Sequence, residues 1–171
     1  MRSLNNFNSL MAILAAFNSA PVHRLQRTWN GTASKDKKLL EGLKQVMDST
    51  GNFSNYRKTL HSIQPPCVPF LGTYLTDLTF IEDGNKDMLN ADKQLINFDK
   101  RLKVAVVIRE IQQYQSMQYC LQPVDIIEQY LVSKFKTVRS IDDLYDLSLK
   151  IEPRESNDDT VLRLLQESGF V

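Results

Sequence analysis

Cysteine, histidine, glycine and proline are scarce in this chain of 171 residues, and each scarcity excludes a class of protein. The two cysteines, Cys67 and Cys120, are too few for a disulfide framework, and their apolar surroundings predict buried free thiols. His23 and His61 are the only histidines, and neither lies in a cluster of the ligands that a metal site needs. Six glycines and six prolines are too few for a turn-rich all-β fold.

A large net charge and a long hydrophobic run are missing as well; the net charge is +1. The 21 basic and 20 acidic residues nearly cancel, so we expect no nucleic-acid partner and no attraction to an anionic membrane. No segment approaches the roughly 20 apolar residues of a membrane span, so we expect no membrane insertion. The apolar patch 11–17 is amphipathic, and we interpret it as a core helix rather than as a signal peptide.

The glycine motifs of nucleotide-binding and hydrolytic enzymes are also absent. The chain contains no Walker motif, no Rossmann fingerprint and no nucleophile elbow. We therefore expect no cofactor, no metal and no covalent chemistry. The expected location is cytoplasmic, with any recruitment to a membrane left to other domains or partners.

What the chain does contain is apolar residues at helical spacing along almost its whole length. With 42% apolar and 24% charged residues it has the composition of a soluble globular domain. We expect an all-α fold, an irregular helical domain from which a helical hairpin projects. The expected helices cover about 5–18, 22–29, 39–47, 53–60, 69–83, 100–117, 124–135 and 140–149, with a weak terminal helix at 161–165. Ser140-Ile-Asp-Asp143 resembles a capping box, with Asp in place of Glu, at the start of the helix 140–149. In the helix at 124–135, the residues expected to face inward are Ile126, Ile127, Tyr130 and Leu131.

The segment 69–83 carries the most information about function. Pro69 suits the first turn of a helix, and Gly84 suits the position after its last turn. One face is apolar at 3.6-residue spacing, with Leu71, Tyr74, Leu75, Leu78 and Ile81. Another face is small and polar, with Gly72, Thr76, Thr79 and Asp83. We expect this helix to project from the body with Thr79 and Asp83 exposed, and a second, antiparallel arm to return between 85 and 103. A solvated helix face is the alternative for the polar stripe.

Several blocks of the chain resemble the catalytic domain of the Ras-type guanine-nucleotide exchange factors, and they occur in the same order as in that domain. The resemblance covers about 4–154. Within the family, the sequence is most similar to the son-of-sevenless and Ras-guanine-releasing-factor branch, notably at 112–121. The blocks are 5–18, 22–29, the hairpin 65–85, 95–103, 108–115 and Ile151-Glu-Pro-Arg154.

The resemblance implies a partner, a Ras-family small GTPase of the Ras, Rap or Ral type, and a role for each matching residue. Thr79, Asp83 and Asn85 match the catalytic end of the hairpin, where family members carry a bulkier apolar residue and a Glu at the first two positions. The matching GTPase-binding residues are Met11, Phe53 and Phe70, a pocket for an aromatic side chain of the second switch, and Asn18, Thr76 and Lys103, which make polar contacts. Ordinary core packing is the alternative for Phe53 and Phe70.

The family's domain begins several helices earlier than this chain. The resemblance therefore implies a partial catalytic domain at 1–155, followed by a polar tail at 156–171, with upstream domains of a longer protein as further partners. Two classes of function stay open at this point. One is an active exchange factor, and the other is a non-catalytic helical module that binds a GTPase or a partner chain.

Overall fold

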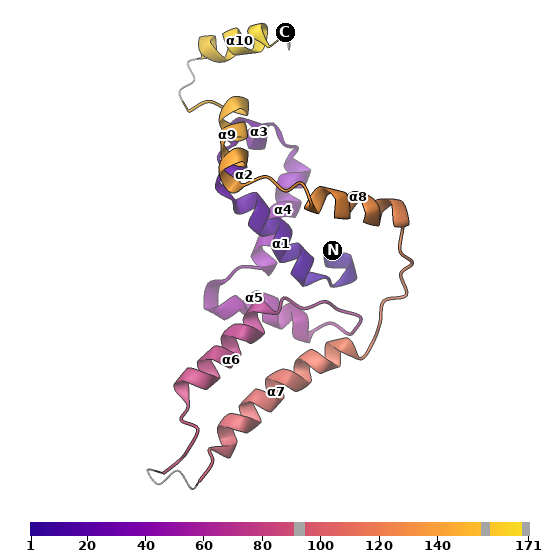
Figure 1. Ribbon diagram of the computed structural model, residues 1–171, viewed down its shortest axis with the longest axis vertical. Coiled ribbons are helices and arrows are strands. Elements are labelled where there is room, and N and C mark those ends of the chain that lie inside the picture. Colours follow the sequence, from indigo (N-terminus) through magenta and orange to yellow (C-terminus); the bar gives the residue numbers. More distant parts are fainter. Residues whose placement is uncertain (91–94, 155–157, 169–171) are drawn as a thin grey trace. The chain divides into compact units, whose positions relative to one another are not determined.

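The computed structural model describes residues 1–90, 95–154 and 158–168, and its regular structure is helical (Figure 1). Within these ranges the only β pairings are isolated bridges from Asn6 to Val68 and from Met88 to Ile96. The all-α expectation is therefore confirmed. In chain order the helices are η1 (Arg2–Leu4), α1 (Phe7–Asn18), α2 (Ala20–His23), α3 (Gln26–Gly31), α4 (Ser34–Val46), α5 (Thr50–His61), α6 (Gly72–Gly84), α7 (Phe98–Gln115), α8 (Asp125–Phe135), α9 (Ile141–Ile151) and α10 (Asp158–Glu167).

Most of the expected helices are present with shifted ends. Helix α6 begins at Gly72 rather than at Pro69, and the segment expected as one short helix at 22–29 is two, because Leu25 leaves the helical conformation between α2 and α3. The expected polar stretch 85–94 is described only as far as residue 90. The division into 1–155 and 156–171 stays a prediction, and α10 extends beyond the 161–165 expected for a terminal helix. None of the described helices has both the length and the apolar composition needed to cross a bilayer.

The chain forms two compact units, the first made of Met1–Leu14 with Lys37–Leu121 and the second of Ala15–Asp36 with Gln122–Val171. The core of the first unit consists of Phe7, Leu10, Leu14, Met47, Tyr56, Leu60, Cys67, Tyr74, Val107 and Tyr114. At its centre the rings of Phe7 and Tyr56 meet edge to face, with their centroids 5.2 Å apart. These contacts fix α5 against α1 and provide the base on which the hairpin stands.

The two cysteines differ in their environments. Cys67 is buried as expected, and burial raises the pKa of its thiol to about 11. Cys120 is exposed, so the expectation of two buried thiols is wrong for this residue. The reason is that Cys120 follows the end of α7 in an irregular segment, where an apolar neighbourhood in the sequence does not become a packed face.

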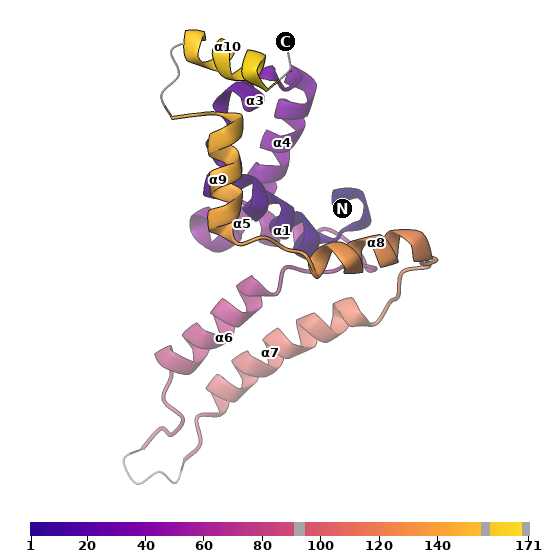
Figure 2. The same cartoon turned by 45° about the horizontal axis from the view of Figure 1, so that its top comes forward.

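Helices α6 and α7 form the hairpin of the first unit and run side by side in both views (Figures 1 and 2). At its base, Tyr74 of α6 and Val107 and Tyr114 of α7 are part of the core. Toward its far end the side chains become exposed, including those of Thr79 and Asp83. The expected projecting helix is therefore confirmed, and an antiparallel arm is present, but its helix α7 runs over Phe98–Gln115 and so lies later in the chain than the 85–103 expected, of which 91–94 are outside the described residues.

The second unit is held together by Arg24 and the end of α9. The Arg24 guanidinium donates to the backbone oxygens of Ser148 and Glu152, each at 2.6 Å. In return the Glu152 carboxylate accepts hydrogen bonds from the backbone N–H groups of Arg27 and Thr28, at 3.2 and 2.8 Å, in the first turn of α3. An acid at a helix N-terminus satisfies donors that otherwise have no partner.

Glu152→Gln is expected to lower the free energy of unfolding by about 1 kcal/mol at pH 7, the usual size of a helix-capping effect. Partial burial opposes ionisation of Glu152, but the hydrogen bonds from Thr28 and Arg27 outweigh it and hold the pKa of this carboxyl below its ordinary value. The stabilisation is therefore present above the unfolded-state pKa of about 4.3 and is lost as the pH falls through the lower folded-state value. Thermal unfolding of both proteins between pH 3 and pH 7 measures this. The difference should shrink in acid, and a difference independent of pH would contradict the assignment; Glu128→Gln, in exposed α8, is the matched control.

Two further expectations concern the second unit. The capping box at Ser140 and Asp143 is present, with each side chain bonded to the other residue's backbone N–H. The inward orientation expected for Ile126, Ile127, Tyr130 and Leu131 is wrong, because all four are exposed on α8. Helical spacing shows which residues share a face, but only tertiary packing decides whether another segment covers it.

Candidate functional site

The exposed side of α6 carries three of the four residues expected on the polar stripe. Thr76, Thr79 and Asp83 are all exposed, whereas Tyr74 on the other side is buried. The threonine hydroxyls donate within their own helix, Thr76 to the Gly72 carbonyl at 2.9 Å and Thr79 to the Leu75 carbonyl at 3.0 Å. The stripe therefore presents small side chains whose donors are already used.

The apolar face of α6 is narrower than its spacing predicts. Tyr74 is buried, and Leu78 and Ile81 are packed against the core. Leu71 and Leu75, expected on the same face, are exposed instead. Leu71 lies before the first turn, and Leu75 follows Tyr74 by about 100° around the helix, which takes it off the line of contact with α7.

Asp83 lies in the last turn of α6, next to the negative end of the helix dipole, where a negative charge is unfavourable. The last turn contains no basic residue, and within the described parts of the chain the Asp83 carboxylate has neither a hydrogen bond nor an ion pair. The neighbouring Glu82 is paired with Lys100 at 2.9 Å. Asp83 is thus an unpaired, exposed anion at the end of a helix that is anchored at its base.

Asn85 and Lys103 are brought together from the two arms of the hairpin. The Asn85 side chain donates to the Ile81 carbonyl at 2.9 Å and closes the end of α6. Its oxygen accepts from the Lys103 ammonium at 3.4 Å, and Lys103 also pairs with Asp99 at 2.7 Å. This contact places an amide and a cation next to the turn that carries Asp83.

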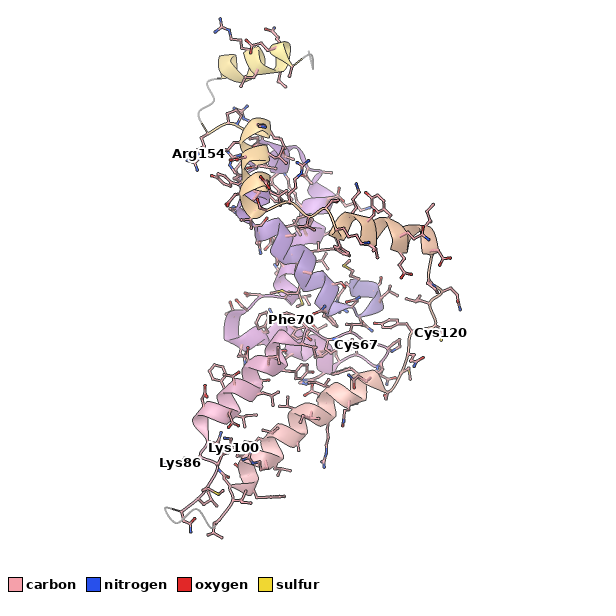
Figure 3. All side chains as sticks on the ribbon, in the orientation of Figure 1. Cys67, Phe70, Lys86, Lys100, Cys120 and Arg154 are labelled. Atoms are coloured by element: carbon pink, nitrogen blue, oxygen red, sulfur yellow. The ribbon has the colours of Figure 1, made fainter. Side chains whose placement is uncertain are left out.

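Phe53 and Phe70 also meet, with ring centroids 5.7 Å apart, and both are partly buried against the core of the first unit, as is Met11. The backbone N–H of Phe70 donates to the Tyr56 hydroxyl at 2.7 Å and fixes the chain just before α6 (Figure 3). Asn18, by contrast, is the last residue of α1 and belongs to the second unit, where its side chain is exposed.

Phe53 adopts an unusual backbone conformation. It ends a run of three left-handed residues, with φ of 61° at Gly51, 55° at Asn52 and 59° at Phe53. A left-handed conformation is costly for a bulky residue. The Arg57 guanidinium stabilises the run by donating to the Asn52 carbonyl at 2.9 Å.

The structure adds residues that the sequence did not single out. Arg57 forms two hydrogen bonds with Asp77 of α6, at 2.8 and 2.9 Å, and so ties the turn before Phe53 to the hairpin. Glu110 of α7 accepts from the hydroxyl of Tyr74 at 2.9 Å, and burial together with this bond raises the pKa of Tyr74. Twenty or more residues separate these partners, so no local pattern in the sequence marks them.

The described residues contain no group of three or more histidine, cysteine or acidic side chains that could hold a metal ion. The arrangement is instead a surface: an anchored helix, a partly buried aromatic pair at its base, and an unpaired acid at its far end. Such a surface is suited to binding another macromolecule.

Comparison with known proteins identifies the class. The model of the RasGEF domain family matches residues 1–102, which is more than half of the chain. The chain therefore belongs to the RasGEF domain family.

Individual relatives agree with this assignment. The chain is 42% identical over 153 residues to Ras-specific guanine nucleotide-releasing factor 2 of Danio rerio, with 90% of this chain and 12% of the relative covered. It is 41% identical over 157 residues to Cell division control protein 25 of Saccharomyces cerevisiae, with 91% and 10% covered. It is 43% identical over 159 residues to Protein son of sevenless of Drosophila melanogaster, with 90% and 10% covered. The chain thus spans about a tenth of the length of these relatives.

Proposed function

We propose that the protein is a guanine-nucleotide exchange factor for a Ras-family small GTPase and that it promotes nucleotide release by inserting the α6–α7 hairpin beside the phosphate and Mg²⁺ site. The observation that carries this proposal is the unpaired, exposed Asp83 carboxylate at the end of an anchored helix. Membership of the RasGEF domain family supports it, as does the printed name of the Danio rerio relative, a Ras-specific guanine nucleotide-releasing factor.

The energetic task explains why a rigid, charged wedge is suitable. Picomolar binding of a nucleotide corresponds to about −16 kcal/mol, so unaided release is slow. A factor accelerates release only if it binds the nucleotide-free GTPase better than the loaded one. A carboxylate that occupies the place of a phosphate meets this condition, because it competes for the same backbone donors and is repelled when the phosphates are present.

Each expected site residue has a part in this mechanism. Asp83 competes with phosphate, Thr79 crowds the Mg²⁺ site, and Asn85 holds the end of α6 beside them. The aromatic pair of Phe53 and Phe70, with Met11, receives an aromatic side chain of the second switch. Polar contacts to the GTPase come from Asn18, Thr76 and Lys103. No covalent step is needed, because binding energy alone shifts the GTPase between its two states.

The partner belongs to the Ras, Rap or Ral type in this proposal. Residues 1–155 form the exchange-factor part, the tail 156–171 lies outside it, and upstream domains of a longer protein complete the factor. Its action takes place in the cytoplasm, with other domains or partners recruiting it to the membrane where needed.

Release of a fluorescent guanine nucleotide from purified Ras, Rap and Ral GTPases tests the proposal. We expect the protein to accelerate release from at least one of them in a concentration-dependent manner. Failure to accelerate release from any of them, alone and with upstream sequence added, would reject the proposal.

A non-catalytic interaction module is the second candidate. The observation that favours it is the apolar face of α8, where Ile126, Ile127, Tyr130 and Leu131 are exposed. Stable binding of a GTPase in a pull-down, with no acceleration of nucleotide release, would support this candidate over the first.

A further inference from the structure

Lys100 in the first turn of α7 is almost completely buried, with only 1% of its surface exposed. Its ammonium forms ion pairs with the carboxylates of Glu82 at 2.9 Å and Asp87 at 3.0 Å. It also donates to the backbone carbonyl of Glu82 at 3.2 Å. Lysine is rarely buried to this degree, and then only when its charge is paired.

These contacts join three successive segments at the far end of the hairpin: the last turn of α6, the loop that follows it, and the first turn of α7. Figure 3 labels Lys86 and Lys100 at this end of the hairpin. The backbone of the same region is linked through Asn97, whose N–H donates to the Asp87 carbonyl and whose side chain donates to the Lys86 carbonyl, both at 2.8 Å. The Asn97 side chain also caps α7 by accepting from the Lys100 N–H.

The charges in this cluster bear directly on Asp83. Glu82 and Asp83 are adjacent acids at the negative end of a helix dipole, so each destabilises the last turn of α6 unless a cation compensates it. Lys100 provides that compensation for Glu82 and leaves Asp83 unpaired. The hydrogen bond to Glu82 raises the pKa of the Lys100 ammonium above its usual value, with Asp87 adding to this effect against the opposing effect of burial.

We propose that Lys100 is a positioning residue for nucleotide exchange, which fixes the last turn of α6 against α7 so that Asp83 and Thr79 reach the GTPase at a set place. This inference rests on the function proposed above. Because Lys100 is buried, it acts through Glu82 and Asp87 rather than by touching the GTPase. A displacement of about 1 Å at a reacting centre costs roughly 10²-fold in rate in other catalysts, so the loss of such a constraint is measurable.

Lys100→Met tests the proposal, because methionine keeps much of the length of the side chain and removes its charge. The two carboxylates left behind are 58% and 51% exposed, so water can solvate them and the fold is not burdened with a buried anion. Arg101→Met is the matched control: Arg101 also pairs with Asp87, at 2.7 Å, but it is half-exposed. Glu82→Gln and Asp87→Asn each remove the charge of one of the two exposed carboxylates that pair with Lys100.

Two measurements separate positioning from general stability. Hydrogen exchange of the free protein should become faster at the amides of 82–87 and 97–101 in Lys100→Met, with those of 56–60 in α5 unchanged. Corrected for the folded fraction, the maximal rate of nucleotide release should fall at least fivefold, with the half-saturating concentration within twofold of wild type. Glu82→Gln and Asp87→Asn should each cause part of this fall, and Arg101→Met should not.

Unchanged exchange at the hairpin amides, or equal acceleration in α5, would overturn the assignment of Lys100 as the residue that fixes the turn. An unchanged release rate in a protein whose wild type is active would overturn its role in nucleotide exchange. If the wild type releases no nucleotide from any GTPase, the proposed function fails, and the hydrogen-exchange result still decides whether Lys100 holds the end of α6.

Discussion

Asp83→Asn is expected to slow catalysed nucleotide release roughly 10- to 100-fold. The upper end of this range matches the smaller rate losses seen when one charge-stabilising group is removed from a catalytic site. Asparagine has nearly the same shape as aspartate, so the change removes the charge and keeps the size. Asp83 is exposed and has no partner among the described residues, so its replacement costs the fold little. Binding to the nucleotide-free GTPase should weaken far less, because most of the interface lies elsewhere on the surface. Release of a fluorescent nucleotide, with affinity measured separately, distinguishes the two effects.

Asp83→Glu should equal or exceed the wild-type rate, because glutamate keeps the negative charge and its longer side chain reaches further from the helix. Asp146→Asn makes the same chemical change at an exposed acid of α9 and serves as the control. Equal rates for the wild type and Asp83→Asn in an active protein would show that the acid has no part in the mechanism.

Phe70→Ala is expected to raise the concentration of the protein needed for half-maximal exchange by about 30-fold, which corresponds to an interface residue worth 2 kcal/mol. The Phe70 ring packs against Phe53 and is only partly buried, so it is available to a partner. The loss of stability should be smaller than the ~3–5 kcal/mol of a fully buried phenylalanine. The hydrogen bond from its backbone N–H to Tyr56 does not depend on the side chain and should persist. Titration of the exchange rate and thermal unfolding measure the two effects.

Phe135→Ala, at an exposed phenylalanine of α8, is the control for removing an aromatic ring from the surface. If Phe70→Ala lowers the melting temperature strongly and leaves the titration unchanged, Phe70 is a core residue and the pocket assignment is wrong.

The sequence predicted the features that depend on local periodicity. Helical spacing placed Thr79 and Asp83 on one side of α6 and Tyr74 on another, and the expected projection of the hairpin predicted that the first two are exposed. The capping box at Ser140 was also predictable from the sequence, because its two partners, Ser140 and Asp143, lie three residues apart.

Features that depend on tertiary pairing were not predictable in this way. Lys100 stands in the polar run Asp-Lys-Arg, where its burial depends on Glu82 and Asp87 from another segment. Leu75 has the right residue type and nearly the right spacing for a core position, yet it is exposed because the line of contact with α7 is narrow. The prediction of an inward-facing side of α8 was wrong for a related reason: amphipathic spacing contains no information about whether another segment packs against the apolar face.

The left-handed turn at 51–53 has a consequence for how this fold can vary. Glycine at position 53 would adopt the same φ without the cost of order 1–3 kcal/mol that a phenylalanine carries there. It would also remove the ring that faces Phe70. Backbone strain and ring packing therefore act in opposite directions at this position. Arg57 links the two sides of this balance, because the same guanidinium donates to the Asn52 carbonyl within the strained run and pairs with Asp77 of the hairpin.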